Sequence, residues 1–209
     1  MSHLERIQTI WKEKNLGFIF SVIGSLTMGT ISLSGVLKSY SPFTLWYMIF
    51  CYLLALFKIG LRILQKTNAG KWANLYGSLS LFLLGIPLVF AAVFTFLYRS
   101  TPTYPFFWMI YAFALYGTIK MVTAIVSLTK ARKSTDSFQR VAAYFSFTGA
   151  LYTLEMMEFA LLTTFGNGES LSHINVAVQG LALLSISLTM SVLLMVRFIK
   201  DKTSPTPKE

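Results

Sequence analysis

Two glutamates inside an otherwise apolar stretch are the residues whose type and spacing best suit chemistry. Glu155 and Glu158 are three positions apart, so on a helix their side chains share one face. Two carboxylates in a medium of low dielectric constant cannot both ionise at low cost, and we expect at least one to hold a proton. Such a pair can share a proton, coordinate a cation or receive a basic partner, and Tyr152, one turn earlier, could hydrogen-bond it. The structural alternative is a buried, partly protonated pair that only fixes helix packing.

Lys58 and Lys120 also lie inside apolar stretches. An ionised side chain in mid-bilayer costs about 2.5–3.5 kcal/mol on insertion scales, so such residues usually face a bundle interior, a partner or water. Counted along their helices, both lysines are expected about 10 Å nearer the inner boundary than the glutamates, too far for a direct ion pair. We therefore expect a water-filled cavity that holds both sets, or lysines that extend to the headgroups. Gln179, an amide inside the last apolar stretch, is a further candidate for the polar interior.

The composition is typical of a membrane protein. The chain has 209 residues, of which 55% are hydrophobic and 12% charged, and its mean hydropathy is +0.61. Soluble domains carry about 25% charged residues, and a hydrocarbon core of about 30 Å is crossed by about 20 helical residues. We expect an all-α polytopic helical membrane protein. Its six transmembrane helices are expected at residues 16–37, 44–64, 72–98, 105–128, 140–165 and 174–198.

The basic residues outside these stretches predict the orientation. They concentrate on alternate connections and both termini, whereas only Lys38 and Arg99 lie on the opposite side. The positive-inside rule therefore places both termini in the cytoplasm, in a multi-pass protein of the cytoplasmic membrane. We expect a cytoplasmic amphipathic arm at 1–15, the transmembrane domain at 16–202 and a disordered cytoplasmic tail at 203–209. The residues assigned to the inner side are Arg6, Lys12, Lys14, Arg62, Lys66, Lys71, Lys130, Arg132, Lys133, Arg140, Arg197, Lys200, Lys202 and Lys208.

A weak internal repeat relates the apolar stretches. Glycine followed by a small residue and leucine recurs at Gly24, Gly77 and Gly149, and a shift of 62 residues superposes Lys58 on Lys120. These registers suggest three in-out-in hairpins, related by an axis along the membrane normal as in parallel transporter repeats.

The hairpin pattern includes small-residue motifs such as LGIP at 84–87 and LYGTI at 115–119. In this respect the chain resembles the HdeD-type family of bacterial six-span membrane proteins, over most of its length, as a pattern of hydrophobicity and glycine. The resemblance implies a six-helix protein of a bacterial inner membrane, sometimes linked to acid stress. It assigns no functional residue.

The common enzyme motifs are missing from the sequence. It has no phosphate-binding loop, no His-Glu-x-x-His pair and no Gly-x-Ser-x-Gly elbow. The single cysteine, Cys51, excludes an intramolecular disulfide. We therefore expect a protein that is not an enzyme and that uses no cofactor or metal. The net charge of +10 reflects topology, so nucleic acid is not expected as a partner.

The favoured hypothesis is a small transporter-like or channel-like protein that works on a proton or small ion. Its polar centre would combine Glu155 and Glu158 with Lys58 and Lys120 near the inner mouth. The alternative is a non-transporting membrane partner, sensor or stress-protection protein whose buried charges are structural. Besides the lipid bilayer, the partners considered are a proton or small ion, a second copy of the chain and another membrane protein.

Overall fold

Six long α-helices make up the fold. The computed structural model describes residues 3–38, 41–67, 69–98, 107–165 and 173–203, and these contain no strand, which confirms the all-α class. The helices cover the six predicted stretches to within a few residues, apart from the longer N-terminal helix, whereas most of the predicted tail (204–209) lies outside the described residues. The helices are α1 (His3–Lys38), α2 (Pro42–Lys66), α3 (Gly70–Tyr98), α4 (Phe107–Lys133), α5 (Ser137–Phe165) and α6 (His173–Thr203).

Five of these helices are long and apolar enough to cross a membrane. This property rests on length and composition alone, and in the described residues it does not extend to α5. The helix that does not qualify is the one that carries Arg140, Glu155 and Glu158. The five segments are Gly17–Lys38, Pro42–Lys66, Trp72–Phe94, Ile110–Lys133 and Val178–Thr203.

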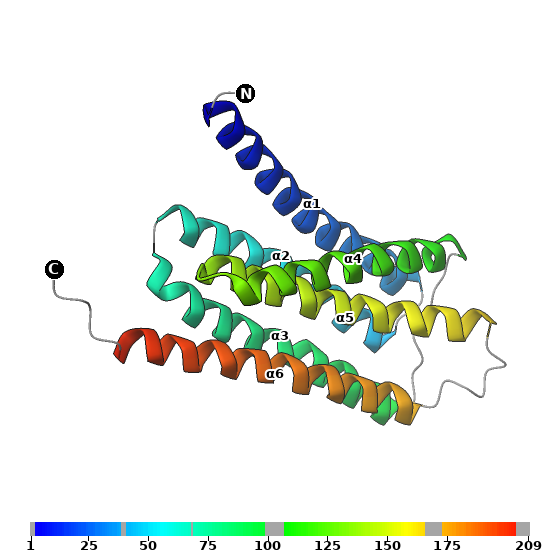
Figure 1. Ribbon diagram of the computed structural model, residues 1–209. Helices are drawn as coiled ribbons and strands as arrows, with labels where there is room; N and C mark the ends of the chain where they lie inside the picture. The colour runs from blue at the N-terminus through cyan, green and yellow to red at the C-terminus, as the bar shows by residue number, and fades with distance from the viewer. Residues whose placement is uncertain (1–2, 39–40, 68, 99–106, 166–172, 204–209) are drawn as a thin grey trace.

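Helix α5 is the inner helix of the bundle. It contacts α2, α3, α4 and α6, and Figure 1 shows it running between these neighbours. Its residues Val141, Phe145 and Met156 are completely buried. Among the described residues, the large exposed hydrophobic side chains come almost entirely from the other five helices, and α5 contributes only Leu161. The polar helix is therefore shielded by the apolar ones, an arrangement that lowers the cost of its charges in lipid.

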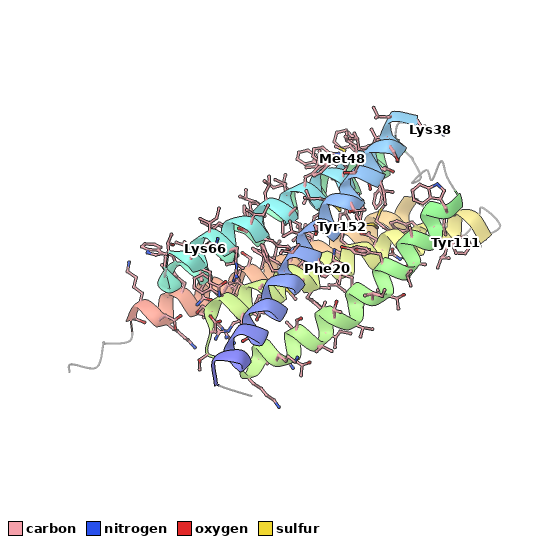
Figure 2. The ribbon with its side chains drawn as sticks, turned by 90° about the horizontal axis from the view of Figure 1, so that it is seen from above. Phe20, Lys38, Met48, Lys66, Tyr111 and Tyr152 are labelled. Atoms are coloured by element: carbon pink, nitrogen blue, oxygen red, sulfur yellow. The ribbon has the colours of Figure 1, made fainter. Side chains whose placement is uncertain are left out.

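Helix α1 is continuous from His3 to Lys38, and its N-terminal part extends beyond the other helices (Figure 1). The part of the predicted arm that the structure describes, from His3 onward, is therefore the first part of α1, which continues into the bundle. Helices α1 and α2 are antiparallel, since Lys38 and Lys66 at their C-terminal ends lie at opposite ends of the molecule (Figure 2).

The helix contacts only partly follow the predicted hairpins. Helix α1 packs against α2, but α3 packs mainly against α6 and α2, and α4 packs against α5. A main contact between α3 and α4 is missing from the described part of the chain. The three-hairpin repeat therefore stays a prediction from the sequence register.

Small and hydroxyl side chains join α3 to α6. Ser191 Oγ donates a hydrogen bond to the carbonyl oxygen of Ser78 (2.8 Å), and Ser187 Oγ donates to that of Leu81 (3.1 Å). A methyl group at Gly180 would lie 3.1 Å from Ala92 Cβ, so the two backbones approach closely there. Such interfaces are typical of helices packed in lipid, where apolar burial alone does not drive association.

Candidate functional site

Lys58 is buried between α2 and α1. Its side chain is 4% exposed, and its Nζ donates to Ser21 Oγ (2.8 Å), to Ser25 Oγ (3.1 Å) and to the carbonyl oxygen of Ser21 (3.2 Å). These three acceptors satisfy all three donors of an ammonium group. The described side chain of Lys58 is therefore bonded to α1 within the bundle, an arrangement that differs from both expectations, a water-filled cavity shared with the glutamates or extension to the headgroups.

The side chain of Lys120, on α4, lies where α4 packs against α5. Its Nζ lies 3.5 Å from Thr153 Oγ1 and 5.0 Å from the centre of the Tyr116 ring, a cation–π geometry. A methyl group at Gly149 would lie 3.2 Å from this Nζ and 2.6 Å from Leu54 Cδ2. Gly149 therefore provides the space in which the lysine lies.

The two lysines belong to one polar group, which we call the lysine cluster. Their charges are close enough to repel each other, and Tyr116 links the two sites, since a methyl group at Gly24 beside Ser25 would lie 2.6 Å from its Oη. Within the described residues, the cluster contains hydroxyl and carbonyl acceptors but no carboxylate in ion-pair distance of either lysine. Its members, from α1, α2, α4 and α5, are Ser21, Ser25, Lys58, Tyr116, Lys120 and Thr153.

Glu155 is the least satisfied polar side chain of α5. It is 5% exposed, and neither carboxylate oxygen has a hydrogen-bond partner in the described part of the structure. A buried carboxylate that is not paired would carry a large desolvation cost, so the neutral, protonated form is the one compatible with this position.

Glu158, one turn further along α5, is exposed and accepts a hydrogen bond from Gln179 Nε2 on α6 at 3.0 Å. The amide oxygen of Gln179 is buried and has no partner among the described residues. The structure thus brings together two predicted site residues, Glu158 and Gln179, and leaves Glu155 beside them in the apolar interior.

Tyr152 belongs to an aromatic cluster and faces α2. Its ring centre lies 4.3 Å from that of Phe50, 5.0 Å from that of Tyr47 and 6.5 Å from that of Phe43. Figure 2 shows Tyr152 in the middle of the bundle, and the side chain is 1% exposed. Its main described contacts are therefore aromatic and come from α2.

The lysines and glutamates lie on different faces of α5. Lys120 contacts the face that presents Gly149 and Thr153, whereas Glu155 is two positions after Thr153, a rotation of about 200° around the helix. Neither lysine forms an ion pair with either glutamate in the described residues. Rotation around α5 therefore separates Lys120 from Glu155, and Lys58 is bonded to α1 instead.

Sequence reasoning did not identify the serine and tyrosine partners of the lysines. A signal was present, because Gly24-Ser25 and Gly149 belong to the repeated glycine motif and sit at the two ends of the cluster. The pattern marks where helices approach closely, but it does not say which side chain enters the space. Ser21 and Thr153 carry no such mark.

The described residues contain no group of three or more His, Cys, Asp or Glu side chains arranged to hold a metal ion. Comparison with protein-family models, with characterised proteins and with solved structures finds no match for this chain. The resemblance to HdeD-type proteins therefore stays a prediction from the hydrophobic pattern, and the function must be argued from the geometry.

Proposed function

We propose that the chain is a small integral membrane protein of transporter-like or channel-like type, in which α5 carries a proton or small cation. The observation that carries the proposal is Glu155, a carboxyl group buried in the inner helix of an apolar bundle with no hydrogen-bond partner among the described residues. Ionisable residues inside membrane bundles are costly and commonly mark ion pathways and proton relays.

Glu158 supports a proton as the transported species. It is exposed, one turn from Glu155, and side chains at this spacing have Cβ atoms about 5–6 Å apart. A proton taken up by Glu158 could pass to Glu155 after modest side-chain rotation, with Gln179 holding Glu158 in the receiving position.

The proposal also includes the membrane topology predicted from the sequence. In this proposal all six helices cross the membrane, with α5 packed among α2, α3, α4 and α6, and both termini lie in the cytoplasm of a bacterial-type cell. This orientation places the lysine cluster and the glutamates in one bundle, on two faces of α5.

The proposal is tested by proton flux into proteoliposomes under an imposed membrane potential, followed with an enclosed pH-sensitive dye. The variants are Glu155→Gln, Glu158→Gln and both together, each of which keeps the side-chain shape. Glu13→Gln, a glutamate outside the predicted spans, is the matched control. We expect the double variant to lower the flux by about tenfold or more and the control to leave it unchanged. Equal flux in the wild type and the double variant, at equal reconstituted amounts, would refute the mechanism.

The bonding of Lys58 favours a second candidate, a non-transporting membrane protein whose buried charges are structural. Three acceptors on α1 hold this lysine, a geometry that ties α2 to α1 without requiring a ligand. The second candidate predicts no flux above that of protein-free vesicles for the wild type, and a lower melting temperature when a hydroxyl acceptor of Lys58 is removed.

A further inference from the structure

A groove opens between α4 and α6 at one end of the bundle. Its volume is about 330 Å³, within the usual range for ligand sites, and the side chains of α4, α5 and α6 line it. Helix α5 forms its floor through Tyr144 and Arg140. The C-terminal ends of α4 and α6 and the N-terminal end of α5 lie together there (Figure 1). Here the covering helices leave Arg140 and Tyr144 of the inner helix partly exposed.

Three arginines gather in this groove, one from each helix: Arg132, Arg140 and Arg197. We call the site the arginine groove. Arg132 and Arg197 are exposed, and neither has a hydrogen bond or ion pair among the described residues. Arg140 Nη2 donates to the carbonyl oxygen of Ser134 (3.1 Å), but its Nε is buried and without a partner there.

The nearby acidic side chains are engaged by other groups. Asp136 and Asp201 are close enough to attract Arg140, whereas Arg197 is close enough to repel it. Asp136 Oδ1 accepts a hydrogen bond from the Phe138 backbone N–H (2.9 Å), and Asp201 Oδ2 accepts one from Asn74 Nδ2 (3.0 Å). Three guanidinium groups face two nearby carboxylates, so the groove keeps an excess of positive charge, and both carboxylates already accept a hydrogen bond from another group.

The rest of the lining is largely apolar. Ile186, Met190 and Leu193 continue the groove along α6 away from the arginines. The lining residues of α6 extend from Ser185 to Arg197, which corresponds to about 18 Å along the helix axis. One leaflet contributes about half of a hydrocarbon core of about 30 Å, so the groove has the length of one leaflet.

We propose that the arginine groove binds an anionic phospholipid, with the headgroup phosphate among the three guanidinium groups and one acyl chain along α6. Guanidinium groups match phosphate oxygens in charge and in planar, two-pronged geometry. A free phosphate would use the arginines but not the apolar lining, whereas a zwitterionic phospholipid would bring a cationic group beside its phosphate and leave the excess positive charge of the groove unbalanced. Only a lipid that combines acyl chains with a net negative headgroup complements the whole groove. The site is separate from the glutamates of α5, so it does not depend on proton transport.

The test is lipid binding to the purified protein in mild detergent, measured by native mass spectrometry with phosphatidylglycerol and phosphatidylcholine of identical acyl chains. We expect the wild type to prefer phosphatidylglycerol by about tenfold or more, and Arg132→Gln/Arg197→Gln to lose this preference. The matched control is Lys130→Gln/Lys202→Gln, which removes two exposed charges from the same helix ends outside the groove and should keep the preference. Since neither exposed arginine has a described partner, the fold should tolerate the first pair of changes.

A second variant tests the acyl chain without changing charge. Leu193→Trp fills the apolar part of the groove and should weaken the binding of phosphatidylglycerol. Equal preference in the arginine variant and the wild type would overturn the proposal, as would an equal loss in the lysine control, which would indicate attraction by general surface charge. Displacement of the bound lipid by an equal concentration of inorganic phosphate would likewise overturn it, because the acyl chain would then contribute nothing.

Discussion

Replacing one hydroxyl acceptor of Lys58 tests whether the lysine cluster holds a charged ammonium group. Ser25 supplies one of three acceptors to Lys58 Nζ, at 3.1 Å. Hydrogen bonds to charged groups contribute about 1.5–3 kcal/mol, whereas neutral hydrogen bonds between membrane helices average about 0.6 kcal/mol. If the lysine is charged, Ser25→Ala should cost about 1.5–3 kcal/mol. For a chain of this size that corresponds to a decrease in melting temperature of about 3–12 °C.

Ser25→Ala is then combined with Lys58→Met, a substitution that keeps the approximate length of the side chain but removes the ammonium group. In that background Ser25→Ala should cost about 0.6 kcal/mol or less, because no donor is left unsatisfied. Lys58→Met alone should be neutral or stabilising, since it removes a buried cation that has no described carboxylate partner.

The free energies of unfolding are measured by reversible denaturation in mixed micelles, as a double-mutant cycle over Ser25 and Lys58. Ser127→Ala is the control, because its hydroxyl bonds only within α4, to the carbonyl oxygen of Thr123 (2.8 Å). A cost of Ser25→Ala that is the same with and without the lysine would refute the charged cluster.

Three further predictions follow from packing and burial. Gly149→Ala should destabilise the protein by about 1–3 kcal/mol, because the new methyl group would lie 2.6 Å from Leu54 Cδ2. The control Gly17→Ala, where nothing lies within 4 Å of the new methyl group, should be neutral or stabilising. The melting temperatures of both variants are measured in the same micelle system. Glu155→Leu should unfold at the same or higher temperature while losing proton flux, and a clear decrease in melting temperature would show an unrecognised partner. Ser191→Ala should cost about 0.6 kcal/mol, with an upper limit near 1.7, through the lost bond to Ser78 across α3 and α6; a cost above that limit in micelle denaturation would contradict the assignment.

The helical class and the helix positions follow from the sequence alone. Hydropathy is a sum along the chain, so long apolar stretches can be located without knowledge of their neighbours. The predicted stretch 44–64 lies within Pro42–Lys66, where a proline in the first turn starts α2. The polar character of α5 was also readable, since Glu155 and Glu158 stand in an otherwise apolar segment.

Only the tertiary structure decides which helix is covered by the others and which face each polar side chain occupies. From the sequence, an apolar stretch that contains charges is predicted as one more membrane span. No local feature of the sequence indicates that α5 packs in the interior of the bundle and α4 at its surface. The 62-residue register that relates Lys58 to Lys120 gives no information on their partners, which belong to α1 and α5.

The physical reason is that rotation of a helix about its own axis is set by contacts with its neighbours. Two positions along α5 change the direction of a side chain by about 200°, which separates the Thr153 face from Glu155. The same holds for the arginines. In the sequence they indicate only the orientation of the helices across the membrane, whereas the packing of α4 and α6 around α5 brings Arg132, Arg140 and Arg197 into one groove. Charge and hydropathy are properties of single segments, whereas a site is a property of how the segments meet.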